Sequence, residues 1–105
     1  MDAPEFKAKD IYDITAVTGI GDYTETPDKS RFLYQKSDKV FLVINKNTIE
    51  VRTDAERSKL LREKYESVME SRYFGRGGIE IVLAGHQLSS EELNDIVRLS
   101  YNLTN

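Results

Sequence analysis

The sequence contains no cysteine, a single histidine and no long apolar run. Without cysteine the chain can form neither a disulfide framework nor a thiolate metal site. His86 cannot supply both members of a histidine metal pair, and no carboxylate near it has ligand spacing, so we expect no metal and no cofactor. No nucleophile motif accompanies His86, and no pair of carboxylates stands out for acid–base work. We therefore expect a protein that is not an enzyme.

Apolar residues make up 39% of the 105 residues, but no long stretch gathers them. The longest run, residues 40–44, has the length of a strand, whereas a helix that spans a bilayer needs about 20 apolar residues. Residues 1–9 lack the basic region and apolar run of a secretory signal. We predict a cytoplasmic protein with no membrane partner, folded as a single domain over residues 1–105.

Charge is distributed unevenly along the chain, although the net charge of −3 counts against a nucleic-acid partner. Residues 28–76 hold twelve basic and eight acidic residues. Residues 1–27 hold two basic and six acidic residues, and residues 77–105 hold one and four. A basic middle between acidic ends is typical of an anion-binding face, and it is equally typical of ordinary solvated charge on strands and a helix.

The first half of the chain predicts one helix and three strands. Apolar residues at helical spacing predict a helix over 5–18, and the polar segment 21–30 is predicted to be a loop. Alternating or continuous apolar residues then predict strands at 31–36, 39–45 and 48–52, joined by a tight turn at 37–38 and a second turn at 45–47. Together these strands predict an antiparallel meander.

The second half predicts two capped helices. One covers 54–66, where Thr53 and Glu56 have the spacing of a capping box. The other begins after Ser89, which forms a second capping box with Glu92, and the pair Leu88 and Leu93 has the spacing of a hydrophobic staple.

Between these helices, residues 67–74 are compatible with a strand or an irregular segment, 75–78 with a turn, and 79–83 with a strand. The predicted fold is α+β: an antiparallel sheet of four to five strands packed with three helices.

Six basic and aromatic residues are candidates for binding nucleic acid or an anion: Lys36, Lys39, Lys46, Arg72, Tyr73 and Arg76. The lysines lie at predicted hairpin tips, where they can contact phosphates, or where they can prevent pairing between sheet edges. The remaining three surround the glycines of segment 75–78. That segment can expose backbone N–H groups to a phosphate, or it can simply need glycine for a turn.

Three strings of the sequence resemble the MmcQ/YjbR-like family, small bacterial proteins with a double-wing motif of DNA-binding type. They are KVFLVINKNTIEVRTDAERSKLL, RYFGRGGIEIVL and the closing helix SSEELNDIVRLSYNLT. The chain departs from the family at Thr18, where a proline is common, and at Gly78 or Ile79, where an aromatic residue is common. The N-terminal domain of TfoX-type competence regulators has a similar order of elements and is a rival assignment.

The resemblance implies an uncharacterised, non-enzymatic domain that binds DNA through its hairpin tips. The residues leave a second hypothesis open, which is a protein-interaction or small anionic-ligand module with no role on nucleic acid.

Overall fold

A six-stranded antiparallel sheet forms the frame of the protein, in a computed structural model that describes residues 17, 19–85 and 87–104. Its strands lie in the order β1-β2-β3-β4-β6-β5. Every neighbouring pair is antiparallel, so short connections suffice for all but the β4 to β5 step. The strands are β1 (Thr24–Asp28), β2 (Arg31–Lys36), β3 (Lys39–Ile44), β4 (Thr48–Arg52), β5 (Val68–Ser71) and β6 (Gly75–Val82).

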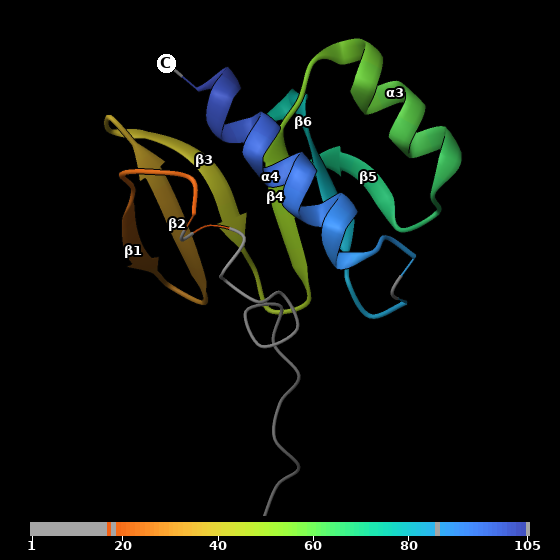
Figure 1. Ribbon diagram of the computed structural model, residues 1–105. Helices are drawn as coiled ribbons and strands as arrows, with labels where there is room; N and C mark the ends of the chain where they lie inside the picture. The colour runs from red at the N-terminus through yellow and green to blue at the C-terminus, as the bar shows by residue number, and fades with distance from the viewer. Residues whose placement is uncertain (1–16, 18, 86, 105) are drawn as a thin grey trace, which may run out of the picture.

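Two helices cover one face of this sheet (Figure 1). Helix α4 (Ser90–Leu103) crosses β3 and β4, and helix α3 (Ala55–Lys64) lies against β5 and β6. The two helices meet where the Tyr65 hydroxyl donates a hydrogen bond to the Glu92 carboxylate. The other face of the sheet is covered by neither helix, and Glu50 and Glu80 lie on it beside the apolar residue Val43.

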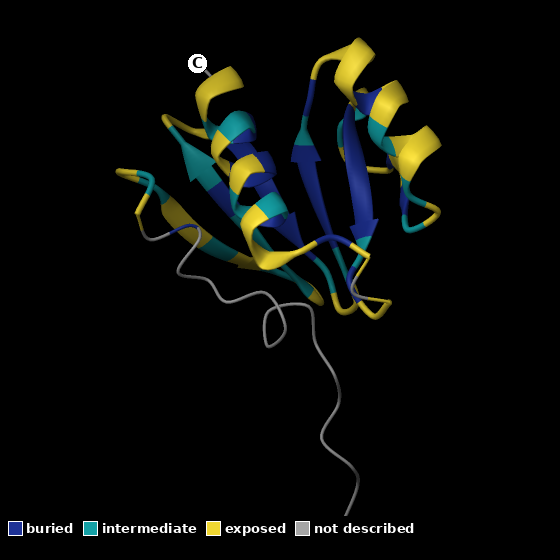
Figure 2. Ribbon diagram, turned by 45° about the vertical axis from the view of Figure 1, so that its right-hand side comes forward, coloured by how far each residue is buried: buried dark blue, intermediate teal, exposed yellow. Residues whose placement is uncertain are grey.

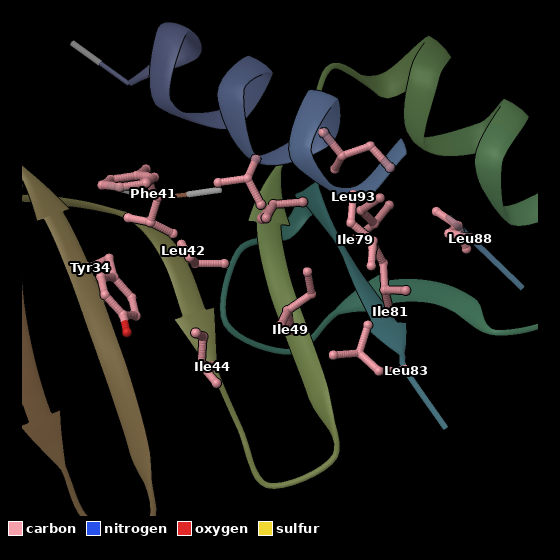
Figure 3. Packing of buried hydrophobic residues seen from close by; sticks show 14 of the residues in the cluster. Tyr34, Phe41, Leu42, Ile44, Ile49, Ile79, Ile81, Leu83, Leu88 and Leu93 are labelled. Atoms are coloured by element: carbon pink, nitrogen blue, oxygen red, sulfur yellow. The ribbon is translucent and has the colours of Figure 1, made fainter. Parts of the chain in front are cut away.

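The core lies between the sheet and α4, which turns its buried residues toward the strands and its exposed residues outward (Figures 2 and 3). Strand pairing aligns apolar side chains in rows across β3, β4 and β6, and each fully buried side chain of this size contributes about 1.5–3 kcal/mol. One row is Leu42, Val51 and Ile79; the next is Ile44, Ile49 and Ile81.

Both ends of α4 are held by specific hydrogen bonds. At its start Ser89 Oγ accepts from the Glu92 N–H at 3.1 Å and Glu92 Oε1 accepts from the Ser89 N–H at 3.2 Å, so the predicted capping box is confirmed. Near its end the buried Ser100 hydroxyl donates to the Phe41 carbonyl and accepts from the Arg52 N–H at 2.7 Å. Ser100 therefore fastens the helix to β3 and β4 together.

The prediction of four to five strands and three helices is wrong. The sheet has six strands, because residues 24–28 of the predicted loop form β1, which pairs with β2 along its whole length. An edge strand needs backbone partners on one side only and little apolar surface, so the polar composition of this segment concealed it. The described part of the chain contains two helices, α3 and α4. The helix predicted over 5–18 falls, Val17 apart, outside the described residues.

The predicted turn at 75–78 is also wrong, because these residues begin β6. The connection from β5 is the three-residue loop 72–74, closed by Gly75 in the left-handed region at φ 64°. Gly78 is needed for a different reason. A Cβ there would lie 2.5 Å from the Val51 carbonyl oxygen and 2.6 Å from Phe74 Cβ. Glycine at this position thus lets the loop residue Phe74 pack down onto the sheet.

The predicted turn at 37–38 is confirmed, with φ values of 51° at Ser37 and 68° at Asp38 that match a two-residue hairpin. The cap of α3, in contrast, is not the predicted one. Asp54 caps this helix by accepting from the Arg57 N–H at 2.7 Å. Thr53 lies one residue too early, and its buried Oγ1 has no hydrogen-bond partner among the described residues.

We expect Thr53→Val to stabilise the protein by about 1 kcal/mol, because valine keeps the shape and removes a buried hydroxyl without a partner. Urea denaturation measures the change. Asp54→Ala is the matched control and should cost about 1 kcal/mol through loss of the cap. A Thr53→Val variant less stable than the wild type would show that the hydroxyl is bonded.

Candidate anion-binding site

The uncovered face of the sheet carries two glutamates at its centre. Glu50 on β4 and Glu80 on β6 are directly paired across the strands and alternate with the residues that face the helices. Their side chains therefore point away from the core, yet Glu50 is only 1% exposed and Glu80 only 2%. Buried carboxylates need hydrogen-bond donors around them, and these donors define the site.

Glu50 is bonded through both of its carboxylate oxygens. Oε1 accepts from the Ser71 hydroxyl and from the Tyr73 N–H, both at 2.8 Å, and Oε2 accepts from Asn45 Nδ2 at 2.9 Å. Burial raises the pKa of Glu50, but these three donors, helped by the positive charge of Arg72, outweigh it and hold the pKa below its ordinary value. Glu50 is therefore a carboxylate at neutral pH.

Glu80 holds Arg72 in a two-pronged ion pair. Arg72 Nε donates to Oε1 at 2.9 Å and Nη2 donates to Oε2 at 2.8 Å, while the Thr48 hydroxyl donates to Oε2 at 2.8 Å. Hydrogen bonding to Glu80 and its charge raise the pKa of the Arg72 guanidinium. The Arg72 side chain is 76% exposed. One edge of its guanidinium is therefore bonded to the buried Glu80 carboxylate, and the other edge faces solvent.

These two glutamates hold the β5–β6 loop over the uncovered face of the sheet. Glu50 binds the backbone of Tyr73 and Glu80 binds the side chain of Arg72, so the loop leans toward the turns at the other end of the sheet. The space left between the loop and those turns is a depression of about 580 Å³. Its walls are the β1–β2 turn, the β3–β4 turn, the β5–β6 loop and nearby residues of β2 and β4. The lining residues are Lys29, Ser30, Arg31, Asn45, Lys46, Glu50, Arg72 and Tyr73.

Four basic side chains from three separate segments line this depression. Arg31 Nε and Nη2 donate to Asp28 Oδ2 at 3.1 and 3.0 Å, and the Arg31 guanidinium lies 5.3 Å from the centre of the Tyr73 ring. Arg72 is paired with Glu80 as above. Lys29 and Lys46 are exposed at the tips of neighbouring turns. The arrangement is suited to an anion that enters from solvent and meets cations from three separate segments.

Three of the six predicted site residues meet here: Lys46, Arg72 and Tyr73. The other three lie elsewhere. Lys36 and Lys39 flank the turn at the opposite end of the sheet, where Lys36 Nζ donates to the Tyr101 carbonyl at 3.0 Å and sits 4.2 Å from the centre of the Tyr101 ring. Arg76 is exposed on β6 and does not line the depression.

Lys29, Arg31 and the glutamate pair were not predicted from the sequence as site residues. The basic residues lie in a segment read as a loop and at the start of the strand after it, and only the pairing of β1 with β2 brings them to the site. Glu50 and Glu80 did carry a signal, since each is a lone acid between apolar residues of a strand. They form a pair because β4 and β6 are neighbours in the sheet, although α3 and β5 separate these strands in the sequence. Local sequence patterns do not show this neighbourhood.

Residues 17, 19–85 and 87–104 hold no group of three or more histidine, aspartate or glutamate side chains placed to bind a metal ion. Over the same ranges, no helix is long and apolar enough to cross a membrane.

A six-stranded antiparallel sheet with two helices on one face defines an α+β domain, as the sequence predicted at that level. The same fold occurs in the crystal structure of Deinococcus radiodurans protein DR2400, which carries the domain DUF419. The two chains superpose with a TM-score of 0.76 over 98% of this chain and 81% of that one, at 17% sequence identity. At this identity the similarity shows the fold alone. No family model and no curated protein matches the sequence.

We expect the stability of the protein to fall when the pH drops below about 4.5, the ordinary pKa of a glutamate, because the fold lowers the pKa of Glu50. A group with a lowered pKa adds stability above its unfolded pKa and loses it as the pH falls through the folded one. Glu50→Gln should cost about 2 kcal/mol at pH 7, since an amide N–H₂ would face N–H and O–H donors.

Urea denaturation at pH 7 and at pH 3.5 measures this difference, which should shrink at the lower pH. Glu70→Gln is the control, because Glu70 is an exposed glutamate of β5, and it should cost little at pH 7. A Glu50→Gln penalty that is the same at both pH values would contradict the assignment of Glu50 as a stabilising carboxylate.

Proposed function

We propose that this chain is a non-enzymatic module that binds a small anionic ligand in the depression on the uncovered face of its sheet. The observation that carries the proposal is the convergence of Lys29, Arg31, Lys46 and Arg72 from three separate segments. The volume of about 580 Å³ lies within the range of small-molecule sites, roughly 300–1,000 Å³.

Arg72 is the side chain best prepared for such a ligand. An arginine has five N–H donors in a planar fork, and Glu80 takes two of them through Nε and Nη2. The remaining donors lie on the outer edge of the guanidinium, and the ion pair with Glu80 fixes their direction. A ligand carboxylate or phosphate can then accept from an arginine that is already ordered, which reduces the entropy lost on binding.

The two glutamates support a binding role over a catalytic one. A general acid or base works best with a pKa near the operating pH, which for a glutamate means a raised pKa. Glu50 has the opposite shift, and its oxygens accept hydrogen bonds from Ser71, Tyr73 and Asn45. We therefore propose that Glu50 and Glu80 position the β5–β6 loop.

We also propose a cytoplasmic location, as predicted from the sequence.

Binding of duplex DNA is the second candidate, as the resemblance to the MmcQ/YjbR-like family implies. One observation favours it: Lys29 and Lys46 lie on adjacent turns at one end of the sheet, where a line of phosphates could contact both. The β2–β3 hairpin is less suited to be a wing, because Lys36 at its tip is bonded to the Tyr101 carbonyl of α4.

Inorganic phosphate should shift the amide resonances of residues 29–31, 45–46 and 72–73 in a titration followed by NMR. Lys46→Gln should weaken binding about five-fold, since one partly exposed charge contact is worth about 1 kcal/mol. Lys39→Gln is the matched control at the other end of the sheet and should leave the affinity unchanged. Equal affinities for the two variants, or shifts elsewhere, would contradict the proposed site.

A labelled DNA duplex of about 20 base pairs separates the two candidates. The small-ligand proposal expects no binding of duplex even at low salt, because the chain carries a net charge of −3. Fluorescence anisotropy at two salt concentrations measures it. Tight binding that weakens steeply with salt, with a slope reduced in Lys29→Gln and Lys46→Gln, would replace the first proposal with the second.

A further inference from the structure

We infer that the ligand of this depression carries a flat aromatic ring next to its anionic group, as a mononucleotide does. The inference rests on the proposed anion site and adds to it the role of Tyr73. Cations alone would recognise any small anion. An exposed aromatic ring in the same wall selects ligands that can also stack.

The Tyr73 ring is held as part of a platform. It is 40% exposed, so a large part of its surface faces the depression and solvent. The Phe74 ring packs against it edge to face, with centroids 5.0 Å apart and planes 77° apart. The Arg31 guanidinium lies over the ring, 5.3 Å from its centroid, and adds a second flat, positively charged group to the stack. Bases stack on tyrosine rings and on guanidinium planes alike.

The platform is fixed from below by buried groups. The Tyr73 N–H is bonded to Glu50 at 2.8 Å, and the next N–H along the chain, that of Phe74, is bonded to the Ser71 hydroxyl at 2.9 Å. Arg72, the residue before Tyr73, is held by Glu80. Three consecutive residues of the loop are thus tied to side chains that are almost fully buried. A ring ordered in this way loses little entropy when a second ring stacks on it.

The ring and the cations are also placed for one ligand to reach both. Tyr73, Lys29 and Lys46 line the same depression, which is large enough for a base, a sugar and a phosphate. If Tyr73 served only the fold, burying its ring would stabilise the protein more than leaving it exposed. The exposure of an ordered aromatic ring beside four basic residues points to ring-and-anion recognition.

The test compares three ligands by calorimetry on the full chain: inorganic phosphate, adenosine and AMP. AMP should bind at least about ten-fold more tightly than phosphate, because stacking adds to the charge contacts. Tyr73→Leu should remove this preference, so that AMP and phosphate bind with similar affinity, and urea denaturation checks that the variant is folded. Tyr73→Phe should keep the preference, since the ring remains.

Phosphate binding with no preference for AMP, in a protein whose Tyr73→Leu variant behaves as the wild type, would overturn the ring inference and leave the anion site standing. If none of phosphate, adenosine and AMP binds, both the anion site and the role of the Tyr73 ring are wrong. A short single-stranded oligonucleotide distinguishes the source of the ligand. Equal affinity for AMP and the oligonucleotide supports a free nucleotide, and a gain of ten-fold or more for the oligonucleotide supports a nucleotide within a strand.

Discussion

The pairing of Glu50 with Glu80 is the constraint on which the uncovered face of this protein depends. Two ionised or ionisable carboxylates placed side by side in the middle of a sheet would repel each other and would be costly to bury. Hydrogen-bond donors from nearby segments offset that cost: Asn45 of the β3–β4 turn, Thr48 at the start of β4, Ser71 at the end of β5, and Arg72 and Tyr73 of the β5–β6 loop. The loop lies over the sheet because the carboxylates need what it donates.

The helices on the opposite face make this arrangement possible. They bury the apolar side of β3, β4 and β6, so the main core forms on that face without a second layer on the other side of the sheet. The second face can then hold a polar network with an open depression beside it. One face can be apolar and the other polar because successive side chains of a strand point to opposite faces of the sheet.

Elements with strong local signals were predictable from the sequence. The meander of β2, β3 and β4 and the Ser89 cap of α4 follow from alternation, turn residues and capping chemistry, all within a few positions of each other. Strand β1 was missed because an edge strand gains its stability from pairing, which leaves little mark on composition. The cap of α3 was misplaced by one residue because Thr53 and Asp54 are both good caps and only the backbone path decides between them.

The site was predictable only in fragments. Lys46, Arg72 and Tyr73 were singled out for their chemistry, but no spacing in the sequence shows that they converge while Lys36 and Lys39 do not. Convergence is set by the strand order, in which β6 inserts between β4 and β5, and by the folding of the 72–74 loop over the sheet. Both are long-range properties, so local patterns carry no information on them.

The hydrogen bonds of Ser100 that link α4 to the sheet have a consequence for co-translational folding. Ser100 is bonded to Phe41 and Arg52, partners 59 and 48 residues away in the sequence. During synthesis the β2–β4 meander emerges before α3, β5, β6 and α4. Its apolar face therefore stays exposed to solvent until α4 has been synthesised. Contacts over such separations slow folding and leave apolar strands exposed in the meantime. The same helix that completes the core therefore sets the interval in which the nascent chain is most prone to aggregate.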